Sequence, residues 1–193
     1  MQVTELLRLA HILSFVFMSA PFYSLIVVNE RGKIPGAVFK VDRYLENMIS
    51  GQSKRCYVFQ FTALITGLLL VRLGGMGLSS IFTNPALGLK TLLLLTLIGL
   101  LSVVHFYIQP RIEAQLSGVT GDAVPEEVMA KIRPLRIKRK KLAAFCLFLV
   151  LSTIILGIQV TSPLGAALNA VLFPLAAVFS WRVYKIPVAY GWL

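Results

Sequence analysis

Five apolar runs, each about twenty residues long, constrain the fold of this chain more than any other feature. They lie at about 6–28, 57–78, 86–108, 142–160 and 164–183. A helix of about 20 residues crosses the hydrocarbon core of a bilayer. Because 57% of the 193 residues are hydrophobic and only 14% are charged, the composition excludes an ordinary soluble domain. The sequence therefore predicts an all-α, polytopic membrane helix bundle.

The basic residues predict how this bundle is oriented. Most lysines and arginines lie in the connections 29–56 and 109–141, whereas the other connections are nearly free of them. With five spans, both basic connections fall on one side of the membrane, and the positive-inside rule makes that side cytoplasmic. We therefore expect an N-terminus outside, a cytoplasmic C-terminus, and a multi-pass protein of the bacterial inner (cytoplasmic) membrane.

The net charge of +11 is explained by this topology rather than by nucleic-acid binding. The basic run Arg136–Lys141 adjoins the fourth span, where anionic lipid headgroups would attract it by about 1 kcal/mol per basic residue. A nucleic-acid interface also needs base-reading or stacking side chains nearby, and this segment has none. The lipid bilayer and its anionic headgroups are the partners that the charge pattern favours.

Both histidines lie inside predicted spans, where an ionisable side chain is costly and usually faces a protein interior, a cofactor or water. At 1.5 Å per residue, His11 lies roughly 7 Å below the outer surface and His105 near the cytoplasmic one. The two are then about 20 Å apart in depth. Two axial ligands of one haem need nitrogens only about 4 Å apart, so His11 and His105 are not expected to share a haem.

Lys90 enters the third span near the outer end, at about the depth of His11. The sequence therefore predicts that His11 and Lys90 face a common pocket in the outer leaflet. Three roles stay open for the pair: haem ligation by the histidine with a propionate held by the lysine, binding of a quinone headgroup, or simple packing with a snorkelling lysine. His105 and Arg111 lie at the inner interface, where they would contact loops and headgroups or form a second site or proton relay.

Other chemistries are disfavoured by what the spans lack. All eight acidic residues lie near the N-terminus or in connections, which argues against a carboxylate-based ion pump and against paired-acid hydrolysis. The methionines form no clustered copper ladder. Cys56 and Cys146 show no metal-binding spacing and are expected to be free thiols packed as small hydrophobic side chains.

Two connecting segments carry helical patterns. Apolar residues recur at helical spacing over 38–49, which indicates either a helix in the headgroup layer or a connector that docks on its own bundle. Pro125 and the two acids that follow it predict a helix start. Pro134 predicts a break or kink before the basic run.

Several short motifs resemble one loose group of bacterial membrane proteins over about residues 5–160. They are Leu6-Leu7-Arg8-Leu9-Ala10-His11-Ile12-Leu13, Thr66-Gly67-Leu68-Leu69-Leu70, Lys90 before a leucine run, His105 followed by Pro110-Arg111-Ile112, and the basic run Arg136–Lys141. The group includes copper-resistance D (CopD) domains, an uncharacterised "predicted integral membrane protein" family related to them, and HemJ-type protoporphyrinogen oxidases.

This resemblance implies a four-helix core over 1–160, with a fifth span and a short tail over 161–193. A HemJ-like protein would bind haem b and oxidise protoporphyrinogen, with its helix-one histidine and helix-three lysine matching His11 and Lys90. A CopD-like protein would take up copper. The chain departs from the HemJ pattern, because no tryptophan follows His11 in the first span and a fifth helix is added.

We therefore predict a redox-type membrane protein that binds haem b or a related porphyrin near the outer leaflet, with His11 as the metal ligand and Lys90 as its partner. One alternative is a non-catalytic accessory subunit, without a cofactor, of a larger respiratory or photosynthetic membrane complex. Protein partners would then be a larger membrane complex or further copies of the chain in a homo-oligomer. The other is a CopD-like copper uptake component. Whether the protein is an enzyme is left open by the sequence.

Overall fold

The computed structural model describes residues 2–28, 39–162 and 164–185, and all regular structure in these ranges is helical. The elements are α1 (Gln2–Val28), α2 (Phe39–Leu73), α3 (Ser80–Thr83), α4 (Pro85–Val103), the π-helical turn η2 (Val104–Ile108), α5 (Gln109–Ser117), α6 (Glu126–Thr161) and α7 (Ala166–Lys185). Five helices are long and apolar enough to cross a membrane, with α4, η2 and α5 counted as one. The predicted all-α architecture of five candidate spans is thus confirmed.

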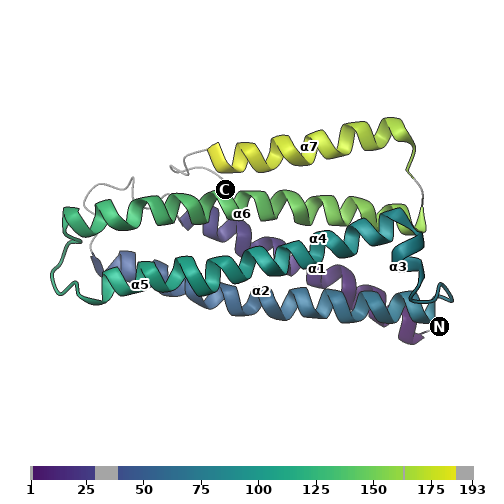
Figure 1. The fold of residues 1–193 in the computed structure, drawn as a ribbon, viewed down its shortest axis with the longest axis horizontal. Coiled ribbons are helices and arrows are strands. Elements are labelled where there is room, and N and C mark those ends of the chain that lie inside the picture. The colour runs from purple at the N-terminus through teal and green to yellow at the C-terminus, as the bar shows by residue number, and fades with distance from the viewer. Residues whose placement is uncertain (1, 29–38, 163, 186–193) are drawn as a thin grey trace.

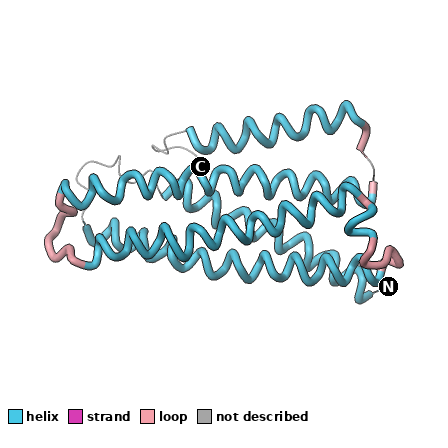
Figure 2. The backbone as a smooth tube through the Cα atoms, in the orientation of Figure 1, coloured by secondary structure: helices cyan, strands magenta, loops and turns pink. Residues whose placement is uncertain are grey.

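Helices α1, α2, α4 and α6 run side by side as an elongated bundle (Figure 1). The helix α1 packs on α2 and α6, and α4 packs mainly on α6. The last helix, α7, lies outside these four, along α6 (Figure 2). We call the half of the bundle with α3 and the α6–α7 turn the His11 half, and the half with α5 and the first turns of α2 and α6 the Arg139 half.

The middle of the bundle, where the two halves meet, has an apolar interior. Its central cluster includes Phe15 and Met18 of α1, Leu97 of α4 and Val150 of α6, which are at most 4% exposed. A second cluster lies farther into the Arg139 half and includes Ile112 and Ile132, both fully buried. The second cluster holds α5 against the start of α6, so much of the predicted connection 109–141 has a packed core of its own.

The third candidate span continues past residue 108 through a local change of helix type. Pro110 has no backbone N–H, and its ring would clash with the carbonyl four residues earlier in a regular helix. Directly before it, the N–H of Gln109 bonds to the carbonyl of Val104, five residues back, which is the π-helical pattern. The helix therefore passes the proline without ending.

The helices α2 and α6 are longer than the sequence predicts. Residues 39–56, predicted as part of a connection, form the first half of α2, and Phe39, Asp42, Glu46 and Ile49 are buried there. The 38–49 pattern thus describes a helix that docks on its own bundle, except for residue 38, which lies outside the described residues. The helix α6 likewise begins at Glu126 and runs through Pro134 without a break.

The predicted end of the second span at residue 78 is wrong. The helix α2 ends at Leu73, and the chain turns through Gly75 and Gly77, whose φ angles are +77° and +49°. These left-handed conformations suit glycine, which has no Cβ to clash. The next long helix, α4, starts at Pro85 and is capped by Asn84, whose side chain accepts hydrogen bonds from the N–H groups of Ala86 and Leu87.

Candidate functional site

His11 forms hydrogen bonds through both nitrogens of its ring. Its Nδ1 lies 2.9 Å from the Thr66 hydroxyl oxygen on α2, and its Nε2 lies 3.0 Å from the Lys90 ammonium on α4. The Thr66 hydroxyl donates its single hydrogen to the Thr62 carbonyl at 2.6 Å. It must therefore accept the bond from His11, which places the ring proton on Nδ1 and leaves the lone pair on Nε2.

Lys90 completes this contact as the donor to Nε2. Its ammonium also lies 5.3 Å from the centre of the Phe15 ring, and the His11 and Phe15 rings meet edge to face at 5.2 Å. A protonated His11 would place two positive charges 3.0 Å apart. The neutral imidazole is therefore the form that this cluster favours. The structure thus brings His11 and Lys90 together, whereas a shared pocket in the outer leaflet stays a prediction.

Two glycines make room for the His11–Lys90 pair. A Cβ at Gly67 on α2 would lie 3.1 Å from Cε1 of His11, and one at Gly157 on α6 would lie 3.1 Å from Nζ of Lys90. Such approaches are tighter than nearly all real Cβ contacts. Helices α1, α2, α4 and α6 thus converge on the pair, and the two glycines allow their backbones close to it.

His105 lies well away from this cluster, as predicted. His105 belongs to the same candidate span as Lys90. It lies fifteen residues farther along, which is about 22 Å at a rise of 1.5 Å per residue. Its ring packs edge to face against Tyr57 and Phe106, and its Nδ1 is buried with no hydrogen-bond partner among the described residues. Arg111 is exposed on α5, so these two residues form no common site with His11.

A second polar cluster, which the sequence analysis missed, occupies the Arg139 half. Arg139 is fully buried, and its two terminal nitrogens face the two carboxylate oxygens of Glu46 on α2. It also donates to Oε1 of Gln109 at 2.6 Å. One turn earlier on α6, Arg136 pairs with Asp42 at 2.6 Å.

The spacing of these charges was the available signal. Asp42 and Glu46 lie four residues apart and Arg136 and Arg139 three apart, so each pair shares one helix face. Arg136 and Arg139, predicted to meet lipid headgroups, instead face inward and are 6% and 0% exposed. Lys138 and Lys141 are the members of the lysine-rich run that remain exposed.

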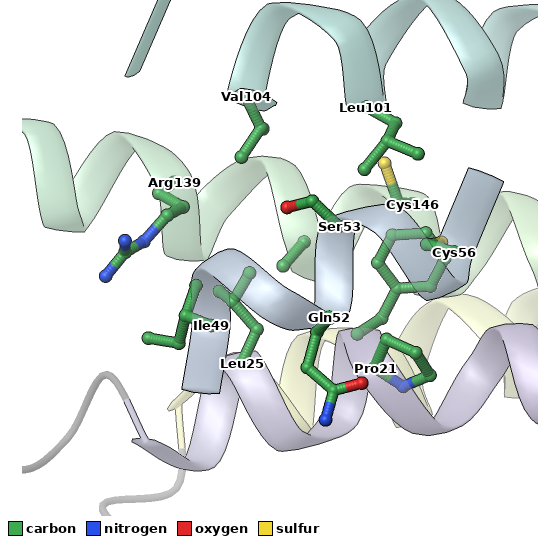
Figure 3. A pocket seen from close by; sticks show the side chains of 12 residues that line it. Pro21, Leu25, Ile49, Gln52, Ser53, Cys56, Leu101, Val104, Arg139 and Cys146 are labelled. Atoms are coloured by element: carbon green, nitrogen blue, oxygen red, sulfur yellow. The ribbon is translucent and has the colours of Figure 1, made fainter. Parts of the chain in front are cut away.

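A small cavity of about 30 Å³ adjoins Arg139 (Figure 3). Ser53, Cys56 and Cys146 also line it. The two thiols are free and buried, as predicted. A space of this size has room for about one or two water molecules at most, which is too small for an organic ligand.

No family model, curated protein or solved structure matches this chain. Among the described residues, no group of three or more histidine, cysteine, aspartate or glutamate side chains is placed to hold a metal ion.

The donor chemistry of this cluster fits one axial ligand of haem b. Nδ1 of His11 bonds to Thr66 and Nε2 carries the lone pair, which is the usual arrangement of a metal-binding histidine. The Lys90 ammonium lies directly in front of that lone pair. Among the described residues, Lys90 is the only group bonded to Nε2, and it would have to turn away before Nε2 could bind a metal. Its flexible side chain allows this movement.

Proposed function

We propose that the protein is a membrane redox-type protein that binds haem b or a related porphyrin at His11. The observation that carries this proposal is the hydrogen-bond arrangement of the imidazole. Thr66 holds Nδ1 as the protonated nitrogen, and the Nε2 lone pair meets only the movable Lys90 ammonium.

Each side chain of the cluster has a stated role in this proposal. His11 would ligate the iron, Thr66 would keep the imidazole in the required tautomer and orientation, and the ammonium of Lys90 would pair with a propionate. Bound haem supplies one-electron redox chemistry. The Phe15 ring, which is only 4% exposed, packs edge to face on His11 and covers one side of the imidazole.

The same proposal assigns the site to the outer leaflet. The positive-inside rule places the Arg139 half, with most of the basic residues, on the cytoplasmic side. The His11 half then faces outward, in the inner membrane of a bacterium. This assignment agrees with the expected CopD- and HemJ-like kinship, in which the helix-one histidine and helix-three lysine act together.

A visible spectrum of the full-length protein, purified in mild detergent, tests the proposal. We expect a Soret band, either as isolated or after titration with hemin, that is lost in His11→Ala. The matched control is His105→Ala, which removes the other membrane histidine and should leave the band unchanged. Lys90→Ala should weaken haem retention because the propionate loses its partner.

A folded, colourless preparation that does not bind added hemin would overturn the haem proposal. Equal haem binding in His11→Ala and the parent protein would do so as well.

A second candidate function is that of an accessory subunit without a cofactor, and α7 is the feature that favours it. Only 17% of the apolar window of α7 is buried, so this helix offers a long free face to another membrane protein. Stoichiometric copurification of a larger membrane complex, from a colourless preparation, would support this function over haem binding.

A further inference from the structure

The helices α6 and α7 enclose a groove in the Arg139 half of the bundle. It has a volume of about 340 Å³ and opens to the outside. Its walls are Lys141, Ala144, Phe145 and Phe148 of α6 and Ala177, Ser180, Trp181 and Tyr184 of α7. The lining combines small side chains with four aromatic rings. A narrow apolar slot of this kind suits a single flexible chain.

The two helices are joined at the opposite end of α7. There the side-chain amide of Gln159 on α6 donates to Asn169 on α7 at 2.6 Å, and Asn169 donates to the Leu164 carbonyl. This polar contact fixes α7 to α6 in the His11 half. Farther along, Ala144 of α6 and Ala177 of α7 contribute only small side chains to the groove lining.

Lysines surround the end of the groove that lies nearest the C-terminal end of α7. Lys141 is exposed and lines the groove. The ammonium of Lys140 lies 4.9 Å from the centre of the Tyr184 ring, and that of Lys185 lies 6.0 Å from the centre of the Trp181 ring. Both lysines are thus held over the rings that form the groove wall. The apolar slot therefore ends in a concentration of positive charge.

Ser180 adds a polar group inside the apolar part of the groove. Its side chain lines the groove and is 4% exposed, and its hydroxyl has no hydrogen-bond partner among the described residues. A buried hydroxyl without a partner is costly. It lies five residues before Lys185, so about 7 Å separates it along the helix from the basic rim.

We propose that this groove binds one anionic glycerophospholipid. An acyl chain occupies the slot between the aromatic rings, the phosphate meets Lys141 and Lys185, and the Ser180 hydroxyl donates to an ester carbonyl. Along α7, Lys185 lies at the rim, the Ser180 hydroxyl lies five residues before it, and the groove continues to Ala177. This order matches the phosphate, ester and chain of a phospholipid. The lipid is independent of the haem site, which lies in the other half of the bundle.

Native mass spectrometry of the full-length protein tests this binding. The probes are phosphatidylglycerol and phosphatidylcholine with the same acyl chains, added to delipidated protein in mild detergent. We expect one phosphatidylglycerol to be retained in preference to phosphatidylcholine. The variants Lys141→Gln and Lys185→Gln should each weaken its retention about fivefold, the effect of one basic residue at an anionic lipid surface.

Two further variants separate the groove from general surface charge. Ala177→Trp fills the slot from an exposed position of α7 and should abolish retention without removing any charge. Lys138→Gln removes an exposed lysine of α6 that does not line the groove, and it should retain phosphatidylglycerol like the parent protein.

The proposal is overturned by equal retention of the two lipids, by unchanged retention in Ala177→Trp, or by an equal loss in Lys138→Gln. A dimer that Ala177→Trp disrupts, in the absence of any retained lipid, would show that a second copy of the chain fills the groove instead.

Discussion

The buried pair Arg139–Glu46 allows a stability prediction with a worked magnitude. Arg139→Met removes the closest cation from Glu46, whose side chain is 3% exposed. Loss of one partner of a buried pair costs about 3–5 kcal/mol. Arg136 remains 3.6 Å from Glu46 and compensates in part, so we expect a loss near the lower limit. For a chain of this length, about 3 kcal/mol lowers Tm by about 6–12 °C.

The double variant Glu46→Leu/Arg139→Met distinguishes a broken ion pair from lost packing. It removes both charges of the pair, so neither is left buried without its partner. The side-chain amide oxygen of Gln109 loses its donor, at a cost of about 1–3 kcal/mol. We expect the double variant to be more stable than the sum of the single losses predicts, by at least about 2 kcal/mol.

The protein supplies its own reporter for this assay. Cys56 and Cys146 are 1% and 2% exposed, so a thiol-reactive fluorescent dye labels them only as the protein unfolds on heating. Single losses that simply add in the double variant would refute the reasoning, because they would show that the two charges do not depend on each other.

Three smaller effects follow from the other contacts. Thr66→Val should destabilise the protein by about 1–3 kcal/mol, since Nδ1 of His11 loses its acceptor; an unchanged Tm in the same dye assay would contradict the tautomer assigned here. Gly67→Ala should lower Tm more than Gly157→Ala, because its Cβ meets the packed imidazole ring whereas the other meets the end of a flexible lysine; the reverse order would show that Lys90 is the more rigid partner. Asn84→Ala should cost about 1 kcal/mol through the lost N-cap of α4, measurable as a shift in the denaturant midpoint against a Thr83→Ala control.

The long-range features that sequence alone predicted were those fixed by membrane depth. Apolar run length located all five candidate spans, and the positive-inside rule placed His11 and Lys90 at one depth. Depth is a one-dimensional quantity, so it can be read from a sequence. Depth also separated His105 from His11 correctly. His11 bonds to Lys90, whereas His105 lies about 22 Å along the helix from Lys90.

The features that sequence did not predict depend on rotation about the helix axes. Asp42 and Glu46 lie in a polar stretch that resembles a connection, and only their shared helix face, turned toward Arg136 and Arg139, makes them interior. Thr66 was missed because hydroxyl residues that bond to their own helix backbone, as at Thr62 and Thr91, are common in apolar helices. Nothing in the apolar pattern distinguishes Thr66, which also contacts a histidine, from these other threonines.

The buried ion pairs also set a condition on how the protein is made. Asp42 and Glu46 leave the ribosome more than ninety residues before their arginine partners. At about 5–20 residues per second of synthesis, the two carboxylates wait about 5–20 s for α6. Until then they must stay hydrated at the membrane surface or be shielded by an insertion factor, so the first turns of α2 dock on the bundle only after the start of α6 has been made.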